Sequence, residues 1–260
     1  MKSWKSFVPL VLALAIVAAA CGEEEAAPTG PALVTPGTLT VCTDAPYPPM
    51  EIEDPSAPGG FTGFDIELMR AIATEMGLGL AVINSGFDPI TSGSAFLAGD
   101  CDIAAASITI RADREQDIDF SAGYFFGDQS FLVKSDSGIT ALDQTSGQRI
   151  AVQSGTTGEL YAQANAPSDT EIVSFENPGD LFLALEAGDV VGILQDIVVN
   201  GERLLTDPTV TLAEFYPTNE FYGFAVANEG SEILLAQVNE ALWKLRFDGT
   251  YDQIFADWFG

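Results

Sequence analysis

The chain has 260 residues, with 38 acidic side chains against 10 lysines and arginines and no histidine, so its net charge is −28. A protein this acidic repels the phosphates of nucleic acids, which we exclude as partners, and its field attracts cations. Without histidine, catalytic triads that use it as the base and histidine metal sites are excluded. We therefore expect no metal and no cofactor.

Residues 1–20 have the layout of a signal peptide, in which two lysines precede an apolar run over residues 7–20. This run is too short to span a bilayer. It ends in A-A-A-C at residues 18–21, which resembles the lipobox of bacterial lipoproteins, although alanine stands first where leucine is usual. We predict an exported protein on the periplasmic side of the cell envelope, anchored to the membrane by a lipid on Cys21 and followed by a flexible tether over residues 21–37. Cleavage by an ordinary signal peptidase, which would release a soluble protein, is the alternative.

From residue 38 onward, predicted strands alternate with predicted helices. The first set has strands at 39–42, 80–83 and 102–106, a hairpin over 50–61, and helices over 65–76 and 90–98. The second set has strands at 129–133, 149–152, 172–175 and 190–194, and helices over 157–164, 178–187 and 197–204. A final strand at 222–227 leads to helices over 231–246 and 251–259. This alternation predicts doubly wound α/β sheets. Two similar halves predict a ligand cleft between them.

The clearest binding signal follows the predicted strand over residues 102–106. This strand runs into Ser107 and Thr109, and Arg114 follows five residues later. Ligands of open α/β sheets lie outside the carboxyl ends of the strands, where hydroxyl groups, amides and an arginine suit a carboxylate. The alternative is a surface arginine beside a helix N-cap.

A second anion signal is the sequence S-G-T-T-G at residues 154–158, which opens a predicted helix. The free N–H groups of a helix N-terminus favour an anion. A phosphate loop would have a lysine here, but Glu159 follows the motif, so a carboxylate is the preferred anion.

Two cysteines, Cys42 and Cys101, remain if Cys21 carries lipid. Each lies in or beside a predicted strand, and an exported protein can form disulfides. The sequence does not decide between a disulfide and two buried thiols, because disulfide geometry is demanding.

Seven short motifs follow one another from Thr38 to Gly260: TVCTDAPYPPME, FTGFDIEL, AAASITIRADR, DIDFSAGY, AVQSGTTG, ILQD and FDGTYDQIFADWFG. In this order and spacing they resemble the family 3 solute-binding proteins of bacterial amino-acid ABC transporters. The resemblance implies a two-lobed periplasmic-binding-protein fold of type II, in which each lobe is a doubly wound, mostly parallel sheet flanked by helices. Lobe 1 would be discontinuous, over residues 38–127 and 221–260, and lobe 2 would span residues 128–220.

The resemblance also implies how an amino acid would be held. Arg114 would bind its α-carboxylate, helped by backbone amides of two threonines. Asp196 would accept its α-ammonium group together with Ser107, and a pocket of one aspartate and two aromatic rings, flanked by two glutamines, would hold its side chain. The implied ligand-binding set is Asp44, Tyr47, Phe87, Ser107, Thr109, Arg114, Gln153, Thr156, Thr157, Gln195 and Asp196.

The side-chain pocket of Asp44, Tyr47 and Phe87 favours a basic or polar amino acid, such as arginine, lysine, glutamine or histidine. Aromatic faces stack on planar or cationic groups, and a carboxylate accepts hydrogen bonds from N–H donors. The alternatives are that Tyr47 packs within its loop, that Phe87 belongs to the core, and that Asp196 caps a helix.

These observations predict the substrate-binding component of an amino-acid ABC importer, a monomer without enzymatic activity that closes its cleft on a free amino acid and delivers it to membrane permease subunits. One alternative is a periplasmic dehydratase of cyclohexadienyl or arogenate-type compounds on the same fold, which would need a general acid of tuned pKa. The other alternative is a ligand-sensing domain. Fold alone does not decide among them.

Overall fold

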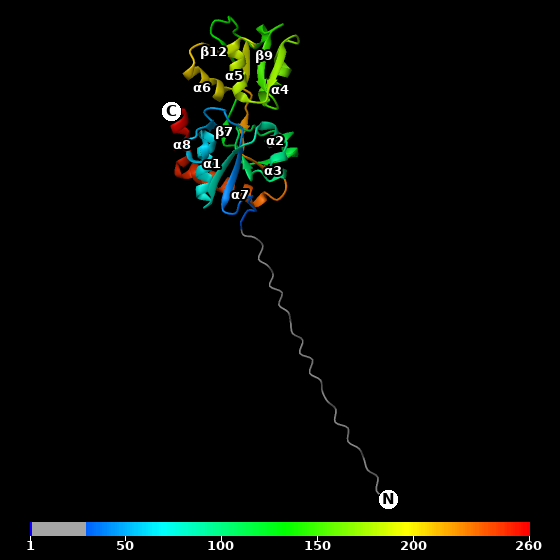
Figure 1. The fold of residues 1–260 in the computed structure, drawn as a ribbon, viewed down its shortest axis with the longest axis vertical. Coiled ribbons are helices and arrows are strands. Elements are labelled where there is room, and N and C mark those ends of the chain that lie inside the picture. The colour runs from blue at the N-terminus through cyan, green and yellow to red at the C-terminus, as the bar shows by residue number, and fades with distance from the viewer. Residues whose placement is uncertain (2–29) are drawn as a thin grey trace.

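The computed structural model describes Met1 and residues 30–260, which form two lobes stacked end to end (Figure 1). Residues 2–29, which hold most of the predicted signal peptide, Cys21 and much of the predicted tether, lie outside the described residues. The chain crosses between the lobes at β7 (Phe125–Phe126) and β13 (Phe221–Tyr222), which pair antiparallel with each other. No helix within the described residues is both long and apolar enough to cross a membrane.

Lobe 1 is built on a five-stranded sheet in the order β4-β1-β5-β14-β6. Its strands are β1 (Thr38–Thr43), β4 (Gly79–Asn84), β5 (Ile103–Ala104), β6 (Ile118–Phe120) and β14 (Ala225–Ala227). The lobe also contains a hairpin of β2 (Ile52–Glu53) and β3 (Phe61–Thr62), and the helices α1 (Phe64–Glu75), α2 (Phe87–Thr91), α3 (Ser94–Ala98), α7 (Glu232–Asp248) and α8 (Thr250–Phe259). The C-terminal helices therefore return to the lobe in which the described fold begins (Figure 1).

Lobe 2 has a second five-stranded sheet, in the order β10-β9-β11-β8-β12. Its strands are β8 (Gln129–Lys134), β9 (Arg149–Gln153), β10 (Glu171–Phe175), β11 (Gly192–Asp196) and β12 (Val210–Tyr216). Its helices are α4 (Thr157–Asn165), α5 (Pro178–Ala187) and α6 (Ile197–Thr206). Helix α4 packs into the apolar cluster on one face of the sheet and α5 into the cluster on the other.

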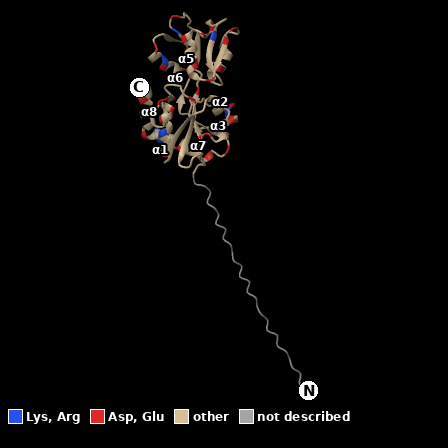
Figure 2. Cartoon of the chain, viewed as in Figure 1, with Lys and Arg blue, Asp and Glu red and all other residues tan. Residues whose placement is uncertain are grey.

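The two sheets have the same topology, in which four strands run parallel and one runs antiparallel to them. In each lobe the antiparallel strand is the one that follows a crossing: β8 follows β7, and β14 follows β13. A chain that arrives from the other lobe enters at the cleft end of the sheet and so runs against the other strands. The predicted two-lobed, mostly parallel α/β fold is confirmed. Acidic side chains are spread over both lobes (Figure 2).

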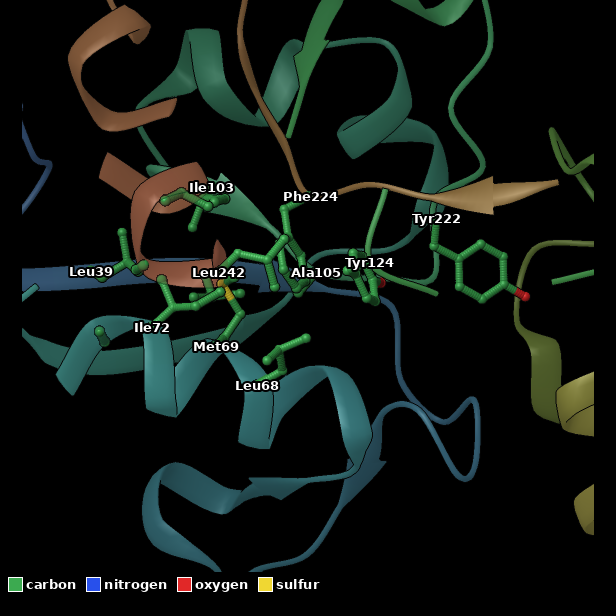
Figure 3. Close-up of a cluster of buried hydrophobic side chains, with 14 of the residues drawn as sticks. Leu39, Leu68, Met69, Ile72, Ile103, Ala105, Tyr124, Tyr222, Phe224 and Leu242 are labelled. Carbon is green, nitrogen blue, oxygen red and sulfur yellow. The ribbon is translucent and has the colours of Figure 1, made fainter. Parts of the chain in front are cut away.

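The largest apolar core lies in lobe 1, between its sheet and the helices α1 and α7 (Figure 3). Met69 and Ile72 of α1 and Leu242 of α7 are buried against Leu39 of β1. Burying each such aliphatic side chain contributes about 1.5–3 kcal/mol. Tyr222 lies at the edge of this cluster with its hydroxyl directed away from the aliphatic residues, toward the second lobe (Figure 3).

A disulfide joins Cys42 of β1 to Cys101, which lies just before β5. Because β1 and β5 are neighbouring parallel strands, the two Cα atoms are only 5.7 Å apart, although 59 positions separate them in the sequence. This pairing answers the question that the sequence left open. Closing a loop of this length reduces the entropy of the unfolded chain by an amount worth about 4 kcal/mol.

Two glycines divide elements that the sequence predicts as continuous. The predicted helix over residues 90–98 is divided into α2 and α3 at Gly93, which has a φ of +73° and where a Cβ would lie 2.8 Å from the carbonyl oxygen of Asp117. The predicted strand over residues 222–227 is divided at Gly223, where a Cβ would meet the side chain of Ile110 at 2.8 Å. Strands β6, β7 and β12 have no predicted counterpart.

The described part of the predicted tether contacts lobe 1. The backbone N–H of Val34 donates to Asp102 Oδ1 at 2.6 Å, and Leu33 packs against the core. Thr35 forms an isolated bridge with Thr38, the first residue of β1. The segment is thus attached to the lobe from Leu33 onward.

Candidate functional site

The carboxyl ends of parallel strands from both lobes meet at one cavity between the lobes. In lobe 1, Asp44 follows β1 and Ser107 follows β5; in lobe 2, Gln153 ends β9 and Asp196 ends β11. This is where open α/β sheets bind ligands. The cavity is lined by Asp44, Tyr47, Phe87, Ala106, Ser107, Thr109, Arg114, Gln153, Thr156, Thr157 and Asp196.

The structure brings together all the predicted site residues except Gln195. Side chains alternate between the two faces of a strand, so Gln195 points away from its neighbour Asp196. It is buried inside lobe 2, where its Nε2 donates to Asn200 Oδ1 at 2.8 Å. We therefore remove Gln195 from the candidate set.

Arg114 supplies a fixed positive charge from lobe 1. It is 6% exposed, and its Nη1 donates to the carbonyl oxygen of Thr109 at 2.8 Å. Its Nη2 donates to the carbonyl oxygen of Gly155 in lobe 2 at 2.9 Å, and its Cζ lies 5.1 Å from the centre of the Phe87 ring. Burial, with a smaller effect from Arg111, lowers the pKa of Arg114 to about 10, so it stays charged at neutral pH. These contacts use two of its five N–H donors and leave the others for an anion.

Asp196 supplies the opposite charge from lobe 2. Its carboxylate accepts hydrogen bonds from the hydroxyls of Tyr47, at 2.8 Å, and Tyr222, at 2.6 Å, and from the amide of Gln129. Burial, helped by nearby Glu220 and opposed by these hydrogen bonds, raises the pKa of Asp196 to about 6. A buried carboxylate held by neutral donors is stabilised further by a cation.

Asp44, which directly follows β1 in lobe 1, is a second buried carboxylate of the cavity. Its Oδ2 accepts a hydrogen bond of 2.6 Å from Gln153 Nε2 across the cleft. Burial, opposed by the Gln153 hydrogen bond and helped by the negative charges of Asp88 and Glu176, raises the pKa of Asp44 to about 6. The surroundings of Asp44 are thus acidic and favour a positively charged group over an anion.

The N-terminus of α4 forms the wall of the cavity beside Arg114. Thr156 caps this helix: its Oγ1 accepts from the N–H of Glu159 at 3.2 Å and donates to the carbonyl of Gln153 at 2.8 Å. Glu159 does not face the cavity, because its Oε2 accepts from the N–H of Gly155 at 2.9 Å. The positive end of the helix and the guanidinium therefore act on the same space.

Three polar residues of the site have no counterpart in the predicted set: Gln129, Glu220 and Tyr222. Two of them donate to Asp196, and Glu220 Oε2 accepts from Thr109 Oγ1 at 3.0 Å. They lie on or next to the two crossings between the lobes, which bring them to the cavity. The only signal for them in the sequence is that position, since no local motif marks them.

The described fold matches one protein family over nearly its whole length. Residues 39–260 match the family model of bacterial extracellular solute-binding proteins, family 3. A probable histidine-binding protein of Neisseria gonorrhoeae is 31% identical over 266 aligned residues, which cover 100% of this chain and 96% of that protein.

Solved structures extend this similarity to three dimensions. An ancestral arginine-binding protein bound to glutamine is 33% identical and superposes with a TM-score of 0.79, over 87% of this chain and 99% of that chain. An ancestral amino acid-binding protein, a precursor of cyclohexadienyl dehydratase, is 33% identical with a TM-score of 0.78, over 86% and 96% of the two chains.

Proposed function

This chain belongs to the family 3 bacterial extracellular solute-binding proteins, and we propose that it captures a free amino acid for an ABC importer. One observation carries the proposal: Arg114 and Asp196 face the same cavity from opposite lobes. Among the described residues, neither takes part in an ion pair within 4.0 Å. A zwitterion supplies both missing partners at once.

The two charged groups of the ligand have matching donors and acceptors. Its α-carboxylate would bind the free N–H groups of Arg114 and the N-terminus of α4 at Thr157. Its α-ammonium group would bind Asp196 and Ser107. Charge-assisted hydrogen bonds of this kind are about twice as strong as neutral ones.

The side chain of the ligand would extend toward Asp44, between the rings of Phe87 and Tyr47. The acidic surroundings of Asp44 favour a basic side chain, and the acidic surface of both lobes raises the local concentration of cations (Figure 2). Relatives named for arginine and histidine support this class. L-Arginine is the first ligand to test.

Binding would stabilise the closed arrangement of the lobes. Hydrogen bonds already cross the cleft, among them Tyr47 to Asp196, Gln153 to Asp44, and Arg114 to the carbonyl of Gly155. A ligand held from both sides adds to these contacts only in the closed state, and so shifts the population toward it. We propose that membrane permease subunits receive the closed form, and that a lipid on Cys21 keeps the protein at the membrane.

We propose that the protein is not an enzyme, although one similar structure is a precursor of a dehydratase. A dehydratase needs a carboxylic acid that is free to protonate a leaving group. Asp44 and Asp196 each accept hydrogen bonds from fixed neighbours, an arrangement that suits cation binding. Turnover of prephenate or arogenate would contradict this proposal.

A thermal-shift screen against the twenty amino acids, followed by calorimetry, tests the function. A ligand that binds only the folded state raises the melting temperature with concentration. We expect L-arginine and other basic or polar amino acids to give the largest shifts, and acidic ones none. If no amino acid changes the melting temperature, the proposal is wrong.

A further inference from the structure

A pair of carboxyl groups lies beneath the floor of the cavity, and neither group is part of the cavity's lining. Glu51 precedes the hairpin of β2 and β3, and Asp65 is the second residue of α1; both side chains are fully buried. Burial of two acidic groups in contact is unfavourable unless one is neutral. Other contacts within the structure must therefore compensate for burying both acidic groups.

Each carboxyl group holds a different atom of Ser107, which lines the cavity. Ser107 Oγ donates to Glu51 Oε1 at 2.9 Å, and the backbone N–H of Ser107 donates to Asp65 Oδ2 at 3.0 Å. The hydroxyl of Tyr124 also donates to Asp65 Oδ2, at 2.5 Å. These bonds hold Ser107 at a φ of +48°, a left-handed conformation that a residue with a side chain rarely adopts.

The remaining oxygens, Glu51 Oε2 and Asp65 Oδ1, have no N–H or O–H donor among the described residues. One proton held between the two carboxyl groups would give these buried oxygens a donor and would remove the unfavourable burial of two like charges. Burial and the charge of Asp65 raise the pKa of Glu51 well above its ordinary value. Burial also raises the pKa of Asp65, but two donors and the N-terminus of α1 oppose that shift. Glu51 is therefore the protonated partner and Asp65 the anion.

The charges around the pair are consistent with this assignment. Asp44 lies on the cavity side and raises the pKa of Glu51 further. Three tyrosines, Tyr47, Tyr124 and Tyr251, also lie near the pair. Arg246 of α7, next to Tyr251, donates to the backbone carbonyls of residues 123 and 124 rather than to either carboxyl group.

We propose that Glu51 and Asp65 share one proton beneath the cavity and act as positioning residues that hold Ser107 as a hydrogen-bond acceptor toward the ligand's ammonium group. The hydroxyl hydrogen of Ser107 is committed to Glu51, so only its oxygen lone pairs face the ligand. The role of Ser107 toward an ammonium group rests on the proposed function, whereas the proton shared by Glu51 and Asp65 does not.

The shared proton is tested in the ligand-free protein with Glu51→Gln, an amide that keeps both hydrogen bonds without titrating. Between pH 6 and 8, unfolding of the wild type exposes Glu51 and releases its proton, so stability falls as pH rises. We expect the unfolding equilibrium constant of the wild type, relative to that of the variant, to rise about tenfold per pH unit in urea titrations. A ratio that stays constant with pH means that folded Glu51 is ionised, and overturns the proposal.

The positioning role is tested by calorimetry with L-arginine at pH 7. We expect Glu51→Gln to bind like the wild type, and Glu51→Met, which loses both hydrogen bonds at similar volume, to bind about tenfold more weakly. In a Ser107→Ala background, Glu51→Met should cause no further loss, because its effect passes through Ser107.

The same loss in both backgrounds would overturn the positioning role, and so would weak binding by Glu51→Gln. Should Glu51→Met fail to fold, weak binding by Glu51→Gln would still overturn the positioning role, and the pH series would still test the shared proton. If the wild type binds no amino acid, the proposed function fails while the pH series still tests the shared proton.

Discussion

The two lobes share a strand order but differ in the segment that follows the third parallel strand. In lobe 2, β11 ends at Asp196 and α6 begins at the next residue, so the carboxylate is fixed at a strand end. In lobe 1, no α-helix joins β5 to β6; an irregular segment with one 3₁₀ turn carries Thr109 and Arg114 over the cleft. The two lobes thus share one strand order, but the negative charge lies where β11 meets α6 and the positive charge lies in the irregular segment between β5 and β6.

The fold provides strand ends at the cleft, whereas the two charged groups of the site need different supports. Strand ends meet at the cleft in both lobes because the parallel sheets face each other there. A guanidinium is long and needs several acceptors to hold it, which the irregular segment supplies through the carbonyl of Thr109. A carboxylate is short, and the strand end suffices to position Asp196.

Removing the cation from lobe 1 should have the largest effect. Arg114→Ala leaves a desolvated ligand carboxylate without its partner, at a cost of about 2–5 kcal/mol, or a roughly 30-fold or greater rise in Kd for L-arginine. Calorimetry measures this directly. Arg111→Ala is the matched control, because it removes the same charge from a residue outside the cavity that pairs with exposed Asp113. Equal losses in both variants would mean that net charge, and not the fixed guanidinium, governs binding.

Removing the negative charge of Asp196 from lobe 2 should weaken ligand binding less than removing Arg114. Because asparagine keeps the shape of the side chain, this variant tests the charge alone. Asp196→Asn keeps the shape and an acceptor for Tyr47 and Tyr222, and we expect Kd to rise about 10-fold to 100-fold. The ligand-free variant should be at least as stable as the wild type at pH 7, because a buried charge is gone. Loss of stability together with binding would indicate that Asp196 has a mainly structural role.

The pH dependence of both properties follows from the same carboxylate. The pKa of Asp196 is raised to about 6 in the folded protein, so the ligand-free wild type should lose stability, relative to Asp196→Asn, as pH rises from about 4 to 6. Below pH 6 protonation of Asp196 competes with the ligand, so Kd should rise as pH falls. Below pH 6, the slope of log Kd against pH should be smaller in magnitude by about one in Asp196→Asn than in the wild type. Identical slopes would assign the titration to another group.

Local patterns in the sequence predict the two α/β halves and the carboxylate-binding part of the cavity, whereas the discontinuous lobe and the rest of the predicted site follow only from the resemblance to the family. Alternating strands and helices indicate the sheets, and polar residues directly after a strand lie at its carboxyl end, as Ser107 and Asp196 do. Gln195 was misplaced because the prediction took the whole ILQD motif, whereas the alternation of a strand sends only Asp196 to the cleft.

The residues that sequence reasoning missed reach the site through long-range topology. Tyr222 and Gln129 come from the two crossings, whose place beside Asp196 depends on how the lobes join. Glu51 and Asp65 lie in segments with predicted structure, but their contact through Ser107 joins positions up to 56 residues apart. Such pairings leave no periodic signal in the chain.

The smallest expected effect concerns the choice of ligand, where the lobes meet through Asp44 and Gln153. Asp44→Asn removes the negative charge while keeping an acceptor for the glutamine amide. We expect the preference for L-arginine over L-glutamine to fall about tenfold, with little change for L-glutamine itself, since a hydrogen bond between two charged groups exceeds a neutral one by roughly 1–2 kcal/mol. Asp180→Asn, an exposed carboxylate of lobe 2, makes the same change in net charge and should leave the ratio unaltered. If Asp44→Asn lowers the melting temperature without altering the ratio of the two Kd values, Asp44 supports the fold and a different group selects the side chain.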